Sequence, residues 1–287
     1  MRGWAALCAL AACGSPAEAP DAAVGTDAPP GCTRPALDAP WLAGMLAQTV
    51  SDLAASPRAT TTERATARTY LTNQLTALGW QGQLAAYPSG ANVAATIPAT
   101  TGSGQEIILG AHFDSVSGSP GANDNASGVA VVLAVARFLV DTPCRTSPVT
   151  VVLFDEEEAG LFGSRAFAQT RTATAVRAVH TIDQVAWDSD GDRRFELEMP
   201  TAALEQEWRA AAAVVGVPVT VTTTQGTDHE SFRDRGLPAV GLTEEYVGGD
   251  TSPFRHQAGD TAATVNAAYL QLAAQLTAQV ILDEVSP

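Results

Sequence analysis

The pattern of apolar and polar positions predicts helices near both ends of the globular part of the chain. Thr60-Thr-Thr-Glu63 forms a capping box, in which the first and fourth residues exchange hydrogen bonds at the start of a helix. Apolar residues then recur at three- and four-residue spacing, which predicts one buried face: Ala67, Leu71, Leu75 and Leu78. A similar spacing near the C-terminus predicts another helix with one apolar face: Val265, Tyr269, Leu272, Leu276 and Val280.

Between these helices, short runs of β-branched and aliphatic residues predict strands. The expected strands cover residues 82–87, 91–97, 106–112, 149–154, 176–183 and 238–243. An apolar helix over 126–140 lies between two of them and fits a crossover between parallel strands. The sequence therefore predicts one α/β domain over residues 41–287. Its central sheet is expected to be largely parallel (mixed), with helices flanking both faces.

The N-terminus has the features of an export signal. A single Arg and a short apolar stretch precede Leu10-Ala-Ala-Cys13, which is similar to the bacterial lipoprotein box, where the cysteine is lipidated. Residues 13–40 are dominated by Ala, Pro, Gly and Asp without periodicity, which predicts a flexible spacer. We expect residues 1–12 to be a signal peptide and the protein to be exported. It would be a membrane-anchored lipoprotein of the cell envelope or, if the signal is an ordinary one, a secreted protein.

The four cysteines divide between this leader and the mature chain. Cys8 and Cys13 belong to the leader, so Cys32 and Cys144 remain. Because an exported chain meets an oxidising compartment, a Cys32–Cys144 disulfide is expected, and it would pin the end of the spacer to the loop before a core strand. Two unpaired thiols are the alternative. Metal binding by this pair is disfavoured because no His or second Cys lies near either one in the sequence.

The net charge of the chain limits the classes of molecule that it is expected to bind. The chain carries 31 acidic against 16 basic residues, a net charge of −15, and every basic residue is Arg. Without a positive surface to neutralise phosphates, a nucleic-acid partner is excluded, whereas metal ions and protonated amines would be attracted. No apolar run reaches the roughly 20 residues that span a bilayer, which argues against a membrane-spanning protein. We expect a monomer.

Histidine and carboxylate residues follow the predicted strands where those strands end. The strand ends carry His112, Asp114, Asp155-Glu-Glu-Glu158 and Asp183, while Asp124 lies in the loop before the predicted crossover helix and His256 lies in the irregular stretch before the C-terminal helix. The carboxyl ends of strands in an open α/β sheet form the crevice where ligands bind. Each residue alone has an ordinary explanation, such as a helix cap, a solvated turn or a surface imidazole. Together the carboxylates would repel one another, and no Arg flanks these strand ends in the sequence, so a pair of divalent ions, Zn²⁺ before Mn²⁺ or Co²⁺, is expected.

Six motifs in this order resemble those of the M28 peptidases, zinc aminopeptidases with two co-catalytic ions. They are His112-x-Asp114, Gly-x-Asn-Asp124-Asn-x-Ser-Gly, Glu157-Glu158-x-Gly-Leu-x-Gly-Ser164, Ile-Asp183, Thr-Asp228-His-x-x-Phe232 and His256-x-x-x-Asp260-Thr. The resemblance covers about residues 60–285 and implies a zinc-exopeptidase-like fold. It also implies hydrolysis of the N-terminal bond of peptides that have a free N-terminus.

The resemblance also assigns roles to these residues. It implies that His112 and Asp183 bind one Zn²⁺, that Glu158 and His256 bind the other, and that Asp124 bridges both. The two ions would activate a hydroxide. By its place in the Gly160-Leu-x-Gly163-Ser164 register, Glu157 would be the general base. Asp114 would orient the His112 ring, and Asp228 would be another orienting residue.

Two positions depart from the family pattern, and three further features have structural explanations. Gln184 follows Asp183 where Met is usual, and Arg255 precedes His256 where some members carry a Tyr that stabilises the oxyanion. Arg255 could take that role or face solvent. We interpret His180 and His229 as structural and Asp188-Ser-Asp190-Gly-Asp192 as a tight acidic turn rather than a Ca²⁺ loop.

Three other functions remain as alternatives. A glutaminyl-cyclase-like acyltransferase would share the fold but use one zinc ion. A carboxypeptidase would need a cationic pocket, for which Arg255 and Arg233 are the candidates. A non-catalytic binding domain would be expected to lack ligands or the base.

Overall fold

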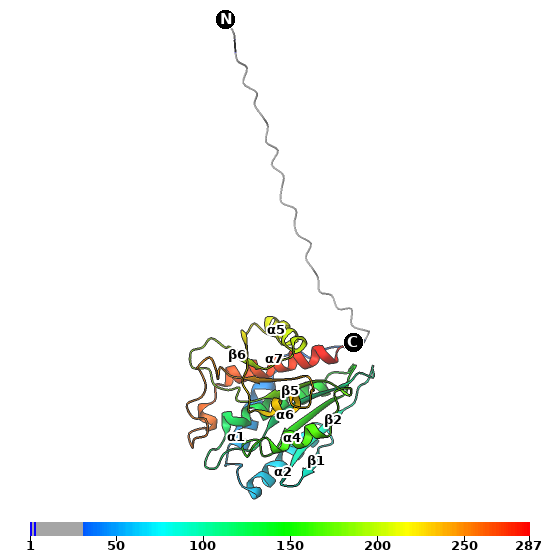
Figure 1. The fold of residues 1–287 in the computed structure, drawn as a ribbon. Helices are drawn as coiled ribbons and strands as arrows, with labels where there is room; N and C mark the ends of the chain where they lie inside the picture. Colours follow the sequence, from blue (N-terminus) through cyan, green and yellow to red (C-terminus); the bar gives the residue numbers. More distant parts are fainter. Residues whose placement is uncertain (2, 4–30) are drawn as a thin grey trace.

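The computed structural model describes residues 1, 3 and 31–287. The rest of the predicted signal peptide, Cys13 and most of the predicted spacer lie outside these residues. The described part of the chain is built around one mixed sheet of eight strands (Figure 1). The strands are β1 Gln83–Tyr87, β2 Gly90–Ile97, β3 Glu106–His112, β4 Val149–Phe154, β5 Val176–Ile182, β6 Phe195–Glu198, β7 Val219–Thr222 and β8 Ala239–Thr243.

The order of strands across the sheet is β1-β2-β4-β3-β5-β8-β6-β7. The central strands β4, β3, β5 and β8 are parallel, whereas β1, β2 and the β6–β8 pairing introduce antiparallel neighbours. All six predicted strands are present, and the largely parallel mixed sheet is confirmed. β6 and β7 were not predicted.

Helices cover both faces of this sheet, as predicted. They are α1 Leu42–Leu53, α2 Thr61–Ala77, α3 Gly128–Val140, α4 Phe162–Gln169, α5 Ala202–Val215, α6 Asp228–Arg233 and α7 Ala267–Val285. One apolar core joins α1, α2, α3, α5 and α7 to the sheet, and a smaller core packs α4 and α6 against the opposite face through Phe167 and Phe232. The capping box at Thr60 is formed as expected.

The crossover helix differs in detail from its prediction. α3 begins at Gly128, and residues Ala122–Ser127 before it form an irregular wide turn. The continuous stretch Ala122–Val140 is long and apolar enough to cross a membrane by composition, but it is 89% buried inside the domain. It is therefore a core helix, and its apolarity reflects contact with the sheet and α7.

The first described residues are fastened to the domain. A disulfide joins Cys32 to Cys144, which confirms the predicted pairing. Arg34 forms an ion pair with Asp283 of α7 at 2.6 Å, and the Leu37 carbonyl accepts a hydrogen bond from Gln275. The end of the predicted spacer is thus held against the C-terminal helix.

Candidate active site

Topology brings three of the predicted residues to one edge of the sheet. His112 is the last residue of β3, while Asp155 and Asp183 directly follow the neighbouring parallel strands β4 and β5. From β3 the chain crosses to β4 on one side, whereas from β5 it continues to β6 on the other side, so the winding of the sheet reverses between the adjacent strands β3 and β5. Ligand sites of open α/β sheets lie at such a point.

His112 is surrounded by carboxylates. Its Nε2 atom lies 3.3 Å from Asp124 Oδ1 and 3.3 Å from Asp183 Oδ1. Its Nδ1 atom lies 3.3 Å from Asp114 Oδ1. One ring nitrogen therefore faces a pair of candidate ligands, while the other faces the carboxylate that fixes the ring.

A second group of ligand atoms forms around His256. Its Nε2 atom lies 3.1 Å from Asp124 Oδ2 and 3.1 Å from Glu158 Oε2. Asp124 thus contributes one oxygen to each group, so the two sets are His112, Asp124 and Asp183, and Asp124, Glu158 and His256. The structure brings together all five residues that the sequence predicted as ligands.

Asp124 is held in place by its backbone. Its amide and that of Asn123 donate hydrogen bonds of 3.0 and 2.8 Å to the two carboxylate oxygens of Asp260. The chain enters this turn at Gly121, whose φ of 64° is left-handed, and a Cβ there would lie 2.5 Å from the Asp124 carbonyl oxygen. Asp260, which sequence reasoning placed in a motif but gave no role, therefore positions the shared carboxylate.

Asp114 links the first group to the acidic turn after β4. Its two oxygens accept hydrogen bonds of 3.1 Å from the backbone amides of Glu157 and Glu158. The same carboxylate also faces the His112 ring. Asp114 therefore sets the position of the ring and of this turn together.

Close packing explains the glycine spacing of the acidic turn. A Cβ on Gly163 would lie 2.2 Å from the Asp155 carbonyl oxygen and 2.4 Å from Asn92 Oδ1. Asn92 is hydrogen-bonded to both segments: its side chain donates to the Gly163 carbonyl and accepts from the Asp155 amide. Only glycine lets α4 begin this close to the end of β4.

The electrostatics of the site favour bound cations. Burial, together with the charges of Asp183, Asp228 and Glu158, raises the pKa of Glu157 to about 10, although His112 opposes this shift. Burial and the Asp124 charge raise the pKa of Glu158 to about 7. Burial also raises the pKa of Asp228, the first residue of α6, to about 7. The two histidines therefore compensate the charge of these carboxylates only in part.

Arginines distant in the sequence do reach part of this edge, which corrects the expectation drawn from flanking residues. Arg64 and Arg68 of α2 form ion pairs with the fully buried Asp155, at 2.7 and 2.5 Å, and Arg64 also pairs with Glu156. Their neutralising charge falls on Asp155 and Glu156, away from the two candidate ligand groups.

Arg58, which sequence reasoning also missed, lies under the turn that carries Asp124. Its guanidinium donates to the carbonyl oxygens of Phe113, Leu53, Pro120 and Gly121. Burial lowers its pKa to about 10.

A signal for the arginines of α2 exists in the sequence. Arg64 precedes Leu71 by seven residues, so it falls on the buried stripe of the predicted helix, where a charged side chain needs a partner.

The remaining histidines, interpreted from the sequence as structural, are buried and belong to neither of the two ligand groups. His180 accepts a hydrogen bond from Trp208 and lies 3.2 Å from Glu284. His229 contacts Thr227 and Glu198.

The residues with uncertain roles lie at or near the site. The buried Asp228 is close enough to His112 and Asp183 for their charges to affect its pKa. Arg255 Nε lies 3.5 Å from Asp124 Oδ2. Arg233 donates to the carbonyls of Met199 and Ala239, so it is engaged away from the ligand groups.

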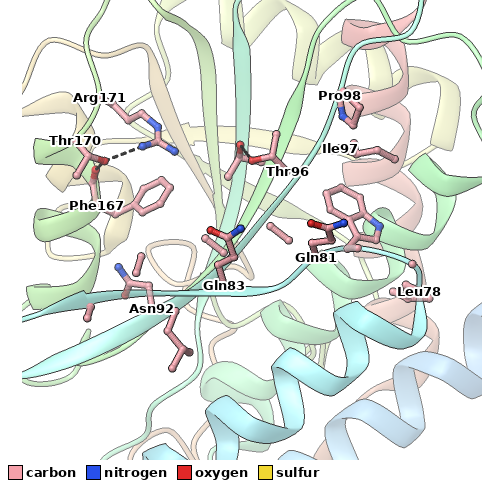
Figure 2. Close-up of a pocket in the computed structure, with 18 of the residues that line it drawn as sticks. Leu78, Gln81, Gln83, Asn92, Thr96, Ile97, Pro98, Phe167, Thr170 and Arg171 are labelled. Carbon is pink, nitrogen blue, oxygen red and sulfur yellow. Dashed lines mark hydrogen bonds between the residues drawn. The ribbon is translucent and has the colours of Figure 1, made fainter.

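A surface cavity of larger volume lies away from the ligand groups. It has a volume of about 850 Å³ and is lined by the β1–β2 hairpin, by α4 and by the segment around Trp80 (Figure 2). None of the predicted site residues lines it. A smaller pocket of about 350 Å³ adjoins the ligand groups and is lined by Glu157, Glu158, Gly160, Leu161, Arg165, Gly226, Glu230 and Arg255.

The donor set fits divalent metal ions. Asp124 Oδ2 and His256 Nε2 are buried side-chain atoms without a hydrogen-bond partner. Imidazole with carboxylate oxygens is a ligand mixture that suits zinc. Two groups that share one carboxylate are the arrangement needed for a pair of neighbouring ions.

Comparison with known proteins identifies a family for this chain. The model of peptidase family M28 matches residues 92–281, which include all five candidate ligands. The chain belongs to this family. A probable lipoprotein aminopeptidase of Mycobacterium tuberculosis, LpqL, is 32% identical over 161 residues, which is 50% of this chain and 32% of LpqL. The chain spans only 32% to 41% of the length of three curated relatives that it matches.

Solved structures share the fold of this M28 chain. An aminopeptidase from Aneurinibacillus sp. strain AM-1 superposes with a TM-score of 0.78 at 17% identity, covering 85% of this chain and 94% of the other. A glutaminyl cyclase of Porphyromonas gingivalis superposes with a TM-score of 0.72 at 19% identity, covering 85% and 98%. The fold is therefore common to two chemistries, and the site must decide between them.

Proposed function

We propose that this chain is a zinc-dependent aminopeptidase that removes the N-terminal residue of peptides. The observation that carries the proposal is the pair of ligand groups sharing Asp124, with Glu157 lining the adjoining pocket. His112 and Asp183 would hold one Zn²⁺, Glu158 and His256 the other, and Asp124 both. When bound, zinc ions polarise a carbonyl and lower the pKa of a water molecule.

The protein's own groups would position the reactants and move the proton. Glu157 would accept a proton from the attacking water and return it to the leaving amine. The backbone bonds from Glu157 and Glu158 to Asp114 keep this turn fixed relative to His112. The acidic surface would favour the approach of a protonated N-terminal amine.

Export and a lipid anchor at Cys13 belong to the same proposal. The leader sequence supports them, as does the name of LpqL as a probable lipoprotein. The disulfide is compatible with an oxidising compartment. We propose that the protein acts as a monomer in the cell envelope or outside the cell.

The test combines metal stoichiometry with a substrate panel. We expect two zinc ions per chain, release of free amino acids from aminoacyl amides, no turnover of N-blocked analogues, and loss of activity with a chelator. One ion per chain together with cyclisation of N-terminal glutamine would favour the glutaminyl-cyclase-like alternative, which the Porphyromonas gingivalis structure keeps open. Release of C-terminal residues would favour a carboxypeptidase.

A further inference from the structure

The pocket beside the ligand groups contains two arginines without a strong partner. Arg165 lies on α4 and lines the pocket with an exposed side chain. No carboxylate of the described residues lies within 4.0 Å of its guanidinium, and Arg255 approaches only Asp124, through Nε at 3.5 Å.

The other arginines near the site are already engaged. Arg64 and Arg68 pair with Asp155, and Arg233 donates to backbone carbonyls. Arg165 and Arg255 therefore supply the positive charge that lines this pocket. Arg255 also lies over the ring of Tyr246, with 5.7 Å between its guanidinium carbon and the ring centroid.

One acidic group, Glu230, shares this pocket without pairing with either arginine. Its Oε2 atom accepts a hydrogen bond of 2.6 Å from the Gly226 amide, and no ion pair joins it to Arg165 or Arg255 within 4.0 Å. The proposed function assigns Glu158 to metal binding and Glu157 to proton transfer. Among the other side chains that line the pocket, two arginines face one carboxylate, that of Glu230. A guanidinium presents a planar set of donors that matches the two oxygens of a carboxylate.

We propose that this pocket binds a carboxylate group of the substrate close to the scissile bond, through Arg165 and Arg255. The proposal rests on the aminopeptidase function, because Glu157 and Glu158 line the same pocket. A volume of about 350 Å³ is at the lower end of small-ligand pockets. The carboxylate belongs either to the C-terminus of a dipeptide or to the side chain of an acidic residue next to the cleaved bond.

Matched substrate pairs separate these two sources. The first pair is Leu-Gly and Leu-Gly-amide, the second is Leu-Glu-amide and Leu-Gln-amide, and the third is the p-nitroanilides of Glu and Gln. For the source that is correct, kcat/KM should favour the carboxylate member on the order of tenfold or more, as charge-assisted hydrogen bonds allow. The preference should shrink as ionic strength rises, because the pocket is open to solvent.

Single substitutions then test the residues. Arg165→Gln and Arg255→Gln should each bring the preference close to one, and Glu230→Gln should increase it by removing the opposing charge. Because Arg255 adjoins His256, zinc content is measured for every variant. If the Arg255→Gln protein loses metal, the test rests on the Arg165→Gln protein. Arg209→Gln, an exposed arginine of α5 that pairs with Glu205, should keep the wild-type preference.

A binding measurement makes the result independent of turnover. In the zinc-loaded Glu157→Gln protein, titration with Leu-Glu-amide and Leu-Gln-amide, and with the Leu-Gly pair, should give a lower Kd for the carboxylate member of one pair. Equal Kd and equal kcat/KM in all pairs would overturn the carboxylate pocket while leaving the aminopeptidase in place. If no peptide is cleaved, the proposed function fails, and the Kd values still decide whether the pocket binds a carboxylate.

Discussion

Glu157 takes its position from the turn around it. Its amide donates to Asp114, and its carbonyl oxygen accepts hydrogen bonds of 2.8 Å from the amides of Gly160 and Leu161. These bonds fix the backbone while the side chain faces the pocket. The carboxylate can therefore be altered without disturbing the residues expected to bind metal.

Glu157→Gln should abolish most of the activity and leave the zinc content unchanged. The amide has nearly the same shape but cannot accept a proton, and general base catalysis typically contributes about 10²–10⁴-fold. The measurement is kcat on an aminoacyl amide together with metal analysis of the same sample. Full activity in this variant would show that another group acts as the base.

The residue scale also shows where sequence reasoning succeeded. The rule that strand ends gather ligands placed His112 and Asp183 together from the residues alone, because both directly end neighbouring parallel strands. Asp124 and His256 come from loops, whose paths no periodicity predicts, so only the family motifs assigned them. Arg58 escaped notice because its partners are backbone carbonyls, which leave no trace in the sequence.

At the scale of elements, the strand β4, the acidic turn and α4 form one closely packed unit. Gly163→Ala should lower the free energy of unfolding by about 1–3 kcal/mol, because the new methyl group meets the Asp155 carbonyl and Asn92. Activity should fall as well, since the turn carries Glu157 and Glu158. Urea denaturation and kcat/KM measure the two effects.

Gly44→Ala is the matched control for this substitution. Gly44 lies inside α1, and a Cβ there meets nothing within 4 Å. Alanine should therefore leave stability unchanged or raise it by up to about 1 kcal/mol through helix propensity. Equal stability of the Gly163→Ala protein and the wild type would mean that α4 can shift without cost.

Elements with buried carboxylates were the hardest to predict. β6 alternates apolar and charged residues, Phe195-Glu-Leu-Glu198, yet all four are buried. Glu196 accepts hydrogen bonds from the amides of Val247 and Gly248, and Glu198 accepts one from Thr227. These partners lie about 30 to 50 residues away, so the local pattern gave no sign that charged positions could sit inside a sheet. The runs of β-branched and aliphatic residues in β3, β4 and β5 are visible in the sequence, so these strands were predicted.

At the scale of the whole molecule, a charged cluster away from the site makes stability depend on pH. Burial and the neighbouring carboxyl of Glu284 raise the pKa of Glu207 to about 7 from an ordinary 4.5. The folded state then keeps a proton that the unfolded state has lost between these values. The contribution of Glu207 to the unfolding free energy therefore decreases as pH rises from 4.5 to 7.

Glu207→Gln should remove this contribution, so the variant should lose less stability than the wild type between pH 5 and pH 8. Urea unfolding at both pH values gives the comparison. Glu205→Gln, a partly exposed carboxyl on the same helix, is the control for loss of one negative charge. A wild-type pH dependence in the Glu207→Gln protein would contradict the raised pKa.

The disulfide closes a long loop, with 112 residues of sequence separation. Its removal in a Cys32→Ser/Cys144→Ser protein should lower the free energy of unfolding by about 2–5 kcal/mol, chiefly because the unfolded chain gains conformational freedom. Metal content and kcat should change little, since neither cysteine lies at the site. Denaturation of the variant and of the oxidised wild type at saturating zinc measures the difference, and equal midpoints would contradict it.

The disulfide lies at the opposite end of β4 from the candidate ligand groups. Cys144 lies in the loop that leads into β4, whereas the acidic turn follows the other end of that strand, about 20 Å away at 3.3 Å per residue. Whatever holds the chain upstream of Cys32 therefore pulls on the edge of the sheet opposite the ligands. If the chain were attached to a surface upstream of Cys32, the edge of the sheet that carries the ligand groups would face away from that surface, toward peptides in the medium.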